Sequence, residues 1–464
     1  MPMKNYKPSS AFSRIVLVIF IFQFAVFNLL SCKKKPTAQE LEAQKRLAEE
    51  ERAKAIELAK NSAISEYASS LSDEARISQL FLVNIEGNQK YSSVEKTGSL
   101  YGKPREGSPL LPGGVLLFSY NISKDPLETY NFIKSIHDFY VDNQTLPPYV
   151  AVDQEGGDVN RLRGLTSVLW AQKKVADSFS IEGSKQLYSA QARQMRNLGF
   201  HMNLAPVAEV LTEKNRGFLD SRSFGNLESV LSYGDIAVKS YEENGIAVVL
   251  KHFPGNSNAD PHLGLPKIEY NDGEWETYFK PFQSLLPKAS AMLMSHAIMQ
   301  PEEKSSGSKE LSEELNLPAC FSSYWIRQVA KKEFCFTGLV FSDDIFMGAL
   351  AKNGYPPEKA ALEAIKAGVD VIMLSEKRFG QVAGLLLARA KEDPEFAKEI
   401  NRAVENVIRY KIKAGILDLK ENEVTESSKI PSFTLGLKTD YAEFDLKKFD
   451  EDYKDGMKAF EMAK

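Results

Sequence analysis

A short stretch, KHFPGNSNADPHLGLP (residues 251–266), gathers side chains that could move a proton. It contains two of the chain's five histidines, His252 and His262, and Asp260 lies two residues before the second. Histidine exchanges a proton near neutral pH, and a neighbouring carboxylate fixes its tautomer and stabilises its cationic form. Because Pro261 favours an extended backbone at Asp260, both side chains are expected to project on one side of the chain. The spacing therefore suits a proton-transferring pair.

Polar residues also stand directly after several apolar runs of the sequence. The residues in this position are Asp153, Lys251, His252, His296, Asp343 and Asp344. One such residue carries little weight, but polar residues follow five of the eight apolar runs. A shared site is therefore favoured over chance.

The apolar runs themselves have the length and composition of strands. We predict strands at residues 80–85, 114–118, 149–152, 201–204, 246–250, 291–294, 339–341 and 369–374. Most are almost continuously apolar, as expected of strands that are buried on both faces. Helical stretches lie between most of them, for example at residues 181–198 and 357–367.

This alternation predicts a parallel sheet, and eight repeats over about 340 residues predict a (β/α)8 barrel of the TIM type. Active residues of such a barrel lie just after the strands, at its C-terminal face, which is where the polar residues stand. The main alternative is a doubly wound open sheet. However, NIEGNQK after the first strand is no glycine-rich phosphate loop.

The motifs together resemble glycoside hydrolase family 3, and more narrowly its NagZ-type β-N-acetylglucosaminidase branch. The resemblance rests on VDQEGG, NLAPV, RSFG, KHFPG with its following D-x-H, and FSDD followed by MGA. It covers roughly residues 71–416, and KHFPG and SDD in this order are the most specific signals. It implies a retaining enzyme that releases non-reducing N-acetylglucosamine from peptidoglycan fragments, without a metal or organic cofactor.

The resemblance also implies a role for each matched residue. Asp343 corresponds to the nucleophile, and His262 with Asp260 corresponds to the acid/base dyad. The residues that match sugar-binding positions are Asp153, Arg161, Arg222, Lys251 and His252, and His296 stands where the family also has a histidine near the site. The chemistry agrees, since retaining hydrolysis needs one carboxylate to attack the anomeric carbon and a proton carrier on the other side.

Structural roles are the alternative for several of these residues. Asp153 could cap a turn, Arg161 and Arg222 could form surface ion pairs, and His296 could be a core histidine. Asp344 is expected to be structural.

Three positions depart from the family pattern and leave other functions open. Asn256 replaces a third histidine after KHFPG, Pro261 stands inside D-x-H, and Asp158 replaces an arginine after EGG. These changes bear on loop dynamics and substrate choice. The alternatives are a non-catalytic glycan-binding lipoprotein on a degenerate barrel, and a phosphorolytic or other-sugar β-glycosidase of the same family.

Residues 1–32 have the organisation of a secretory signal. A basic segment without acidic residues precedes residues 15–30, which carry no charge, and LLSC then ends at Cys32. A segment of sixteen residues without a charge is short for a membrane span, which needs about 20. LLSC resembles the lipobox of bacterial lipoproteins, in which the cysteine is lipidated; an uncleaved anchor is the alternative. We therefore expect an exported lipoprotein, anchored through Cys32 on the periplasmic or cell-surface side of a membrane.

The rest of the chain is predicted to have three parts. Residues 33–70 form a charged helical linker, residues 71–416 form the barrel, and residues 417–464 form a short tail without recognisable chemistry. The net charge of −4, without a basic stripe, argues against a nucleic-acid partner. Cys320 and Cys335 have no metal-binding spacing. A disulfide between them is allowed outside the cytoplasm, but two buried free thiols are favoured.

Overall fold

The computed structural model describes residues 37–91, 110–259, 264–302, 308–422 and 430–463. The chain divides into two compact units, residues 1–60 with 423–431 and residues 61–422 with 432–464. Helix α2 (Ala38–Ser70) begins in the first unit. Strong helix formers dominate its sequence, and Glu42 and Arg46 form an ion pair at 3.6 Å. All strands that the structure describes lie in the second unit.

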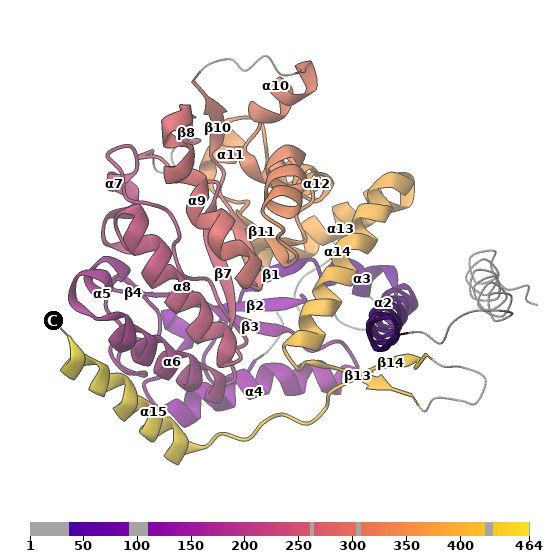
Figure 1. Ribbon diagram of the computed structural model, residues 1–464, viewed down its shortest axis with the longest axis horizontal. Helices are drawn as coiled ribbons and strands as arrows, with labels where there is room; N and C mark the ends of the chain where they lie inside the picture. Colours follow the sequence, from indigo (N-terminus) through magenta and orange to yellow (C-terminus); the bar gives the residue numbers. More distant parts are fainter. Residues whose placement is uncertain (1–36, 92–109, 260–263, 303–307, 423–429, 464) are drawn as a thin grey trace, which may run out of the picture. The chain divides into compact units, whose positions relative to one another are not determined.

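Eight parallel strands of the second unit close into a barrel (Figure 1). Around the barrel they are β1 (Phe81–Asn84), β2 (Gly114–Leu117), β3 (Tyr149–Val152), β6 (Met202–Asn203), β7 (Ala247–Phe253), β9 (Ala291–Met294), β11 (Leu339–Asp344) and β12 (Val371–Ser375). Strand β12 pairs with β1, with Ile372 opposite Phe81. The predicted (β/α)8 barrel is confirmed, and the open doubly wound sheet is excluded.

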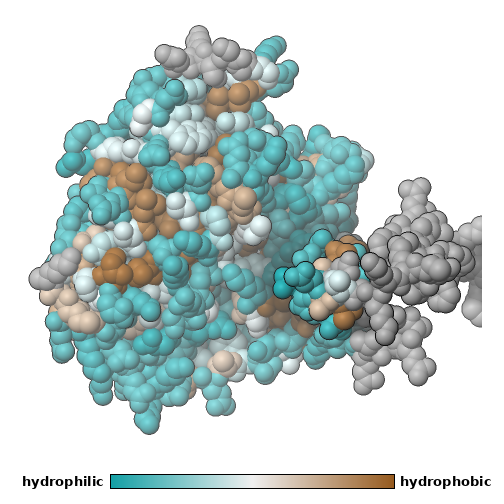
Figure 2. Space-filling model, in the orientation of Figure 1, coloured by the Kyte–Doolittle hydropathy of each residue, from teal (hydrophilic) through white to brown (hydrophobic). Residues whose placement is uncertain are grey.

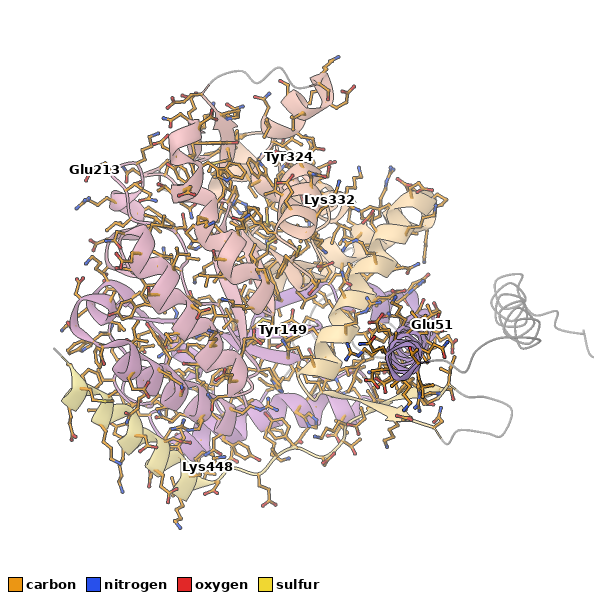
Figure 3. The ribbon with its side chains drawn as sticks, viewed as in Figure 1. Glu51, Tyr149, Glu213, Tyr324, Lys332 and Lys448 are labelled. Carbon is orange, nitrogen blue, oxygen red and sulfur yellow. The ribbon has the colours of Figure 1, made fainter. Side chains whose placement is uncertain are left out.

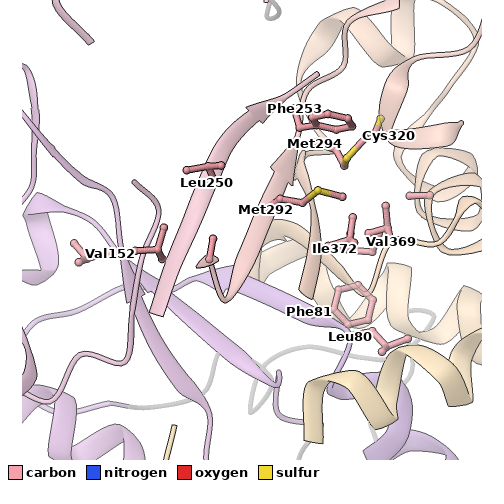
Figure 4. Close-up of a cluster of buried hydrophobic side chains, with 14 of the residues drawn as sticks. Leu80, Phe81, Val152, Leu250, Phe253, Met292, Met294, Cys320, Val369 and Ile372 are labelled. Carbon is pink, nitrogen blue, oxygen red and sulfur yellow. The ribbon is translucent and has the colours of Figure 1, made fainter. Parts of the chain in front are cut away.

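Both faces of the barrel strands are buried, which explains the almost continuous apolar runs. One cluster fills the interior and includes Tyr149, which is labelled in Figure 3. The Tyr149 ring lies 6.3 Å from that of Phe341 and 5.3 Å from that of Tyr410. The alternate residues belong to a second, larger cluster between the strands and the helices, shown in part in Figure 4. Hydrophilic side chains cover most of the face seen in Figure 2.

Amphipathic helices surround the barrel. The longer ones are α4 (Pro126–Asp142), α6 (Ile181–Asn197), α8 (Leu227–Glu243), α9 (Trp275–Leu285), η7 (Tyr324–Glu333), α12 (Pro357–Ala367), α13 (Glu376–Glu392) and α14 (Pro394–Lys413). Side-chain caps fix several starts; the Asn226 side chain, for example, accepts from the Ser229 amide at α8. Helix α14 contributes Val407 and Tyr410 to the interior cluster.

The C-terminal tail contains a hairpin and a helix. Strands β13 (Leu417–Glu421) and β14 (Phe433–Leu437) pair antiparallel, which the sequence did not indicate. Helix α15 (Leu446–Lys458) packs against α6, where Arg193 pairs with Asp452 and Phe449 is buried. Residues 417–422 and 432–464 of the tail are therefore part of the second unit.

The last turns of α2 also belong to the second unit. Ile64 and Ala68 are buried in the larger apolar cluster, so the packed structure begins before residue 71. The predicted domain boundaries stay predictions. Among the described residues, none of the helices combines the length and apolar character that a membrane span needs. The predicted signal segment and Cys32 lie outside the described residues.

Candidate active site

The carboxyl ends of the barrel strands present the polar residues singled out from the sequence. Asp153 follows β3, Lys251 and His252 lie just before the last residue of β7, and Asp343 lies near the end of β11. Arg222 belongs to a single helical turn, η3 (Asp220–Arg222), after the fourth barrel strand. A short antiparallel pair, β4 (Gln154–Gly156) with β5 (Val159–Asn160), follows β3 and leads to Arg161.

Four of the predicted sugar-binding residues form one charged cluster. The Lys251 Nζ atom is buried and lies 2.7 Å from Asp153 Oδ1 and 2.5 Å from Glu155 Oε1. Arg222 donates two hydrogen bonds to Glu155, at 2.8 and 2.9 Å, and Arg161 Nη2 lies 3.8 Å from Asp153 Oδ2. Because buried charges must be paired, Glu155 holds the cluster together.

The cluster fixes the charge of its members. Although burial acts to raise it, the pKa of Glu155 falls to about 2 because Lys251 and Arg222 stabilise the carboxylate. Burial acts to lower the pKa of Lys251, but Asp153 and Glu155 raise it above its ordinary value. Burial, opposed by Lys251 and reinforced by Glu155, raises the pKa of Asp153. Glu155 is therefore ionised and Lys251 is cationic at neutral pH.

His252 is oriented by a second buried carboxylate, Glu209. Its Nδ1 atom lies 2.7 Å from Glu209 Oε1, and its Nε2 atom lies 3.5 Å from Arg222 Nη2. Since an ionised carboxylate only accepts, Nδ1 carries the hydrogen. Glu209 also accepts from the backbone amide of Asn256 at 2.6 Å and from its side chain at 3.2 Å. Asn256, one of the departures from the family pattern, therefore anchors the start of the loop.

Sequence reasoning missed Glu155 and Glu209, although the signal was present. A glutamate inside the apolar run APVAEV, or directly after a buried strand in VDQEGG, must find a charged or hydrogen-bonding partner if it is buried. Both side chains are almost fully buried, and both act on predicted sugar-binding residues.

Asp343 is half-buried at the end of β11, where its Oδ1 atom accepts from the Asp344 amide at 2.9 Å. His296 is buried next to the end of β11, with only 1% of its surface exposed. Its Nε2 atom lies 3.1 Å from the Asp344 carbonyl oxygen, and its Nδ1 atom lies 3.3 Å from Cys320 Sγ. Both ring nitrogens therefore face protein groups, and the Nε2 contact joins His296 to the end of β11.

Residues 108–410, more than half of the 464-residue chain, match the glycosyl hydrolase family 3 N terminal domain. The chain belongs to glycosyl hydrolase family 3. The predicted family and the predicted enzyme class, a glycoside hydrolase, are thereby confirmed.

Relatives of this family 3 hydrolase share a name. It is 29% identical over 264 residues to the beta-hexosaminidase of Idiomarina loihiensis, covering 55% of this chain and 76% of that protein. It is 25% identical over 351 residues to beta-hexosaminidase A of Pseudoalteromonas piscicida, covering 70% of this chain and 58% of that protein. The solved family 3 beta-N-acetylglucosaminidase of Paenibacillus sp. shares the fold, with a TM-score of 0.64, 23% identity, and coverage of 84% and 69%.

The acid/base pair predicted for this family 3 hydrolase, Asp260 and His262, lies outside the described residues. Hydrogen bonds fix the chain before this pair, and strand pairing fixes the chain after it. Asn258 donates from its backbone to the Lys214 carbonyl at 2.8 Å, and its Oδ1 atom accepts from the Gly217 amide at 2.6 Å. Beyond the pair, β8 (Lys267–Tyr270) is parallel to β10 (Ile298–Pro301). The roles of Asp260 and His262 stay predictions.

The two cysteines outside the signal segment differ from the sequence-based expectation in one respect. Both thiols are free, and Cys320 is buried as predicted. The prediction that Cys335 is buried was wrong, because it lies in an exposed turn after η7 with a φ of +56°. Burial and the charge of Asp343 raise the pKa of Cys320 well above its ordinary value, so it stays a thiol. Within the described part of the hydrolase, no group of three or more His, Cys, Asp or Glu side chains could hold a metal ion.

Proposed function

We propose that this family 3 hydrolase is a retaining exo-β-N-acetylglucosaminidase that releases non-reducing N-acetylglucosamine from peptidoglycan fragments or related glycans. One observation carries the proposal: a strand-end carboxylate, Asp343, shares a barrel face with a pre-formed cluster of charged side chains. The names of the relatives support the choice of sugar.

The charged cluster described above, which we call the sugar-binding cluster, has the donors and acceptors that a sugar's hydroxyl groups require. The carboxylate of Asp153 would accept from hydroxyl groups, while Arg161, Arg222 and Lys251 would donate to them. His252 presents its Nε2 atom, because Nδ1 is bound to Glu209. Contacts already made with Glu155 and Glu209 hold these groups in place before substrate binds, so little ordering is needed on binding.

The proposed reaction has two displacements. In the first, Asp343 attacks the anomeric carbon, the glycosidic C–O bond breaks, and the leaving oxygen takes a proton from His262. In the second, His262 takes a proton from water, and the water oxygen displaces Asp343 to release the sugar with its original configuration. Asp260 would stabilise the imidazolium form of His262 before the first step.

We also propose that the protein is exported and anchored through a lipid on Cys32. The support is the sequence of residues 1–32, in which LLSC follows a basic and then an apolar segment. Radiolabelled palmitate should enter the wild-type protein and not Cys32→Ser; equal labelling of both would contradict the anchor.

The enzymatic proposal is tested with p-nitrophenyl N-acetyl-β-glucosaminide. The purified wild-type protein should release p-nitrophenol and N-acetylglucosamine of retained configuration, as followed by NMR early in the reaction. A protein that binds N-acetylglucosamine but releases no phenol would be a glycan-binding lipoprotein. Sugar 1-phosphate formed in phosphate buffer would identify a phosphorylase.

A further inference from the structure

A cavity of 80 Å³ lies at the end of the barrel where the strands begin. Its lining includes Pro148, directly before β3, and His201, directly before β6, whereas Asp153 and Asp343 lie near the ends of their strands. A buried water needs at least roughly 10–15 Å³, so the cavity has room for about five waters or one small organic molecule. None of the roles proposed above uses it.

The segment between β14 and α15 forms one wall of this cavity, which we call the tail cavity. The segment passes α4 on its way to α15 (Figure 1), and there Tyr130 donates to the Ala442 carbonyl at 3.0 Å. The Tyr441 hydroxyl donates to the Gly199 carbonyl at 3.3 Å. Gly199 has a φ of +97°, and a Cβ atom there would overlap the Tyr441 hydroxyl, so only glycine fits. The tail cavity therefore lies between the C-terminal tail and the barrel.

His201 lines the tail cavity with a hydrogen-bond donor that the protein leaves unused. Its Nδ1 atom accepts from the Val150 amide at 3.1 Å, so Nε2 carries the hydrogen of the neutral ring. Burial and the positive charge of Arg196 keep the pKa of His201 well below its ordinary value, which makes the ring neutral. His201 is only 8% exposed, yet Nε2 has no hydrogen-bond partner among the described residues. A bound acceptor would satisfy this donor.

A second histidine of the lining, His137 on α4, also has a ring nitrogen without a partner. Its Nδ1 atom is buried and makes no hydrogen bond to any residue that the structure describes; Asp138 Oδ1 is 3.6 Å away, beyond hydrogen-bond distance. The His137 ring centre lies 4.8 Å from that of Tyr441, beside the tail wall. Buried polar atoms are normally paired, so two such nitrogens at one cavity indicate a polar occupant.

The charged residues of the lining favour an anion. Arg196 is exposed at the end of α6 and donates only a long hydrogen bond, at 3.5 Å, to the Ala414 carbonyl. Neither Lys438 nor Asp440 forms an ion pair with a residue in the described ranges. Two cations and one exposed acid leave the lining with an excess of positive charge.

The rest of the lining is largely apolar, which narrows the class of anion. The buried residues on this side are Ile133, Pro147, Pro148, Val150 and Ile416. An inorganic anion such as phosphate has no apolar surface to place against them. A carboxylate with a short hydrocarbon chain has both a charged end and an apolar end, so it matches both halves of the cavity.

We infer that the tail cavity binds a small organic acid, with its carboxylate at His201 Nε2 and Arg196. Lys438 adds positive charge from the tail, and the hydrocarbon chain packs against Ile133 and Val150. Because the walls come from the barrel and from the tail, the bound acid joins the two. A ligand of about six non-hydrogen atoms should bind with a dissociation constant on the order of 1 mM.

The test titrates the full chain with butyrate, with butyramide, which is its uncharged isostere, and with inorganic phosphate. Calorimetry should give a dissociation constant on the order of 1 mM for butyrate, weaker binding of phosphate and none of butyramide. At about 30 mM, butyrate should raise Tm by about 2 °C. It should also slow hydrogen exchange in residues 438–442, because these residues form the tail wall.

Four variants locate the site. His201→Asn keeps an acceptor for the Val150 amide but removes the Nε2 donor, so butyrate should bind about tenfold more weakly. Lys438→Gln should weaken binding by roughly two- to fivefold. Asp440→Asn should strengthen it by about twofold, a gain that a poorly folded variant cannot produce. Lys447→Gln is the matched control, because Lys447 is an exposed lysine on α15, outside the cavity, and it should bind butyrate as the wild type does.

Three outcomes overturn the inference. They are no binding of butyrate to the wild type at about 30 mM, equal binding of butyrate and butyramide, and binding that neither Lys438→Gln nor Asp440→Asn changes. None of these measurements uses glycosidase activity, so the tail cavity and the proposed function stand or fall separately.

Discussion

Glu155 and Asp343 are two carboxylates at the same end of the barrel, but their surroundings are opposite in kind. Glu155 is almost fully buried, receives two hydrogen bonds from Arg222, and contacts Lys251 at 2.5 Å. Asp343 is half-buried, accepts from the Asp344 backbone amide, and forms no ion pair with any residue in the described ranges. The contacts of Glu155 stabilise its negative charge so strongly that it would be a poor nucleophile. Asp343 has no such counter-charge among the described residues, which fits the proposal that binding and chemistry fall to different residues.

The region around Glu155 and the region around Asp343 also differ in the kind of contact that fixes their side chains. The binding side depends on side-chain charges that neutralise one another between β4, η3 and β7. The chemical side depends on backbone contacts at the end of β11, including the His296 contact with the Asp344 carbonyl. Removing one charge should therefore disturb the binding side structurally, whereas removing the Asp343 charge should affect the reaction alone.

Asp343→Asn should have the largest effect. An amide cannot form the covalent intermediate, so turnover should fall by about 10⁴-fold or more while N-acetylglucosamine binding and thermal stability stay close to wild type. A fluorinated mechanism-based inhibitor, followed by mass spectrometry, should label Asp343. Asp344→Asn is the neighbouring control and should keep most of the activity. A label on Asp344 or Asp153 would refute the assignment.

His262→Ala should have the next largest effect, and one that depends on the leaving group. General acid–base groups contribute about 10²–10⁴-fold, so hydrolysis of a disaccharide should slow by that factor. An activated phenol needs little protonation to depart, so its glycosylation step should be spared, and azide should rescue the second step because it needs no base. Rates measured over a series of leaving groups on the folded variant decide the matter. A uniform loss that parallels lower thermal stability would make His262 structural.

Glu155→Gln should destabilise the charged cluster on the proposed binding side of the site. The variant leaves Lys251 and Arg222 without their shared counter-charge, which should lower the free energy of unfolding by about 3 kcal/mol near neutral pH. The folded-state pKa of Glu155, about 2, lies below its ordinary value of 4.5, so its contribution is present above about pH 4.5 and is lost as the pH falls towards 2.

Urea unfolding of both proteins across this pH range measures the effect. The difference between wild type and variant should shrink as the pH falls from 4.5 to 2, because Glu155 takes up a proton in the unfolded wild-type chain while it stays ionised in the folded protein. A difference that stays constant with pH would show that the loss comes from altered packing and not from charge.

The barrel and the strand-end residues could be predicted because both depend on local pattern. Each buried strand is a short apolar run, and the residue after it lies at the carboxyl end whatever the rest of the chain does. Glu155 and Glu209 were missed because their importance comes from partners far away in the sequence: Glu155 meets Arg222 at a separation of 67 residues, and Glu209 meets His252 at 43. Cys335 was misjudged because a turn residue's exposure depends on where the chain goes next.

Asn256→Ala should have the smallest effect. It tests whether Asn256 only positions the start of the loop beside the proposed binding residues. The backbone amide of Asn256 would still bind Glu209, so the variant loses mainly the side-chain bond at 3.2 Å. A hydrogen bond to a charged group contributes roughly 1.5–3 kcal/mol, but this one is long and Glu209 keeps its contact with His252, so a loss of about 1 kcal/mol is expected.

That loss should appear as roughly a fivefold decrease in kcat/KM, similar for aryl and disaccharide substrates, with no shift in the pH profile. The reason is that Asn256 carries no titratable proton and only positions the start of the loop. Asn256→Asp is the informative partner, because a second carboxylate beside Glu209 would repel it and should cost more than alanine does. A pH profile that moves in Asn256→Ala would instead mean that this amide acts on the proton carrier itself, and the separation between a positioning side and a reacting side would no longer hold.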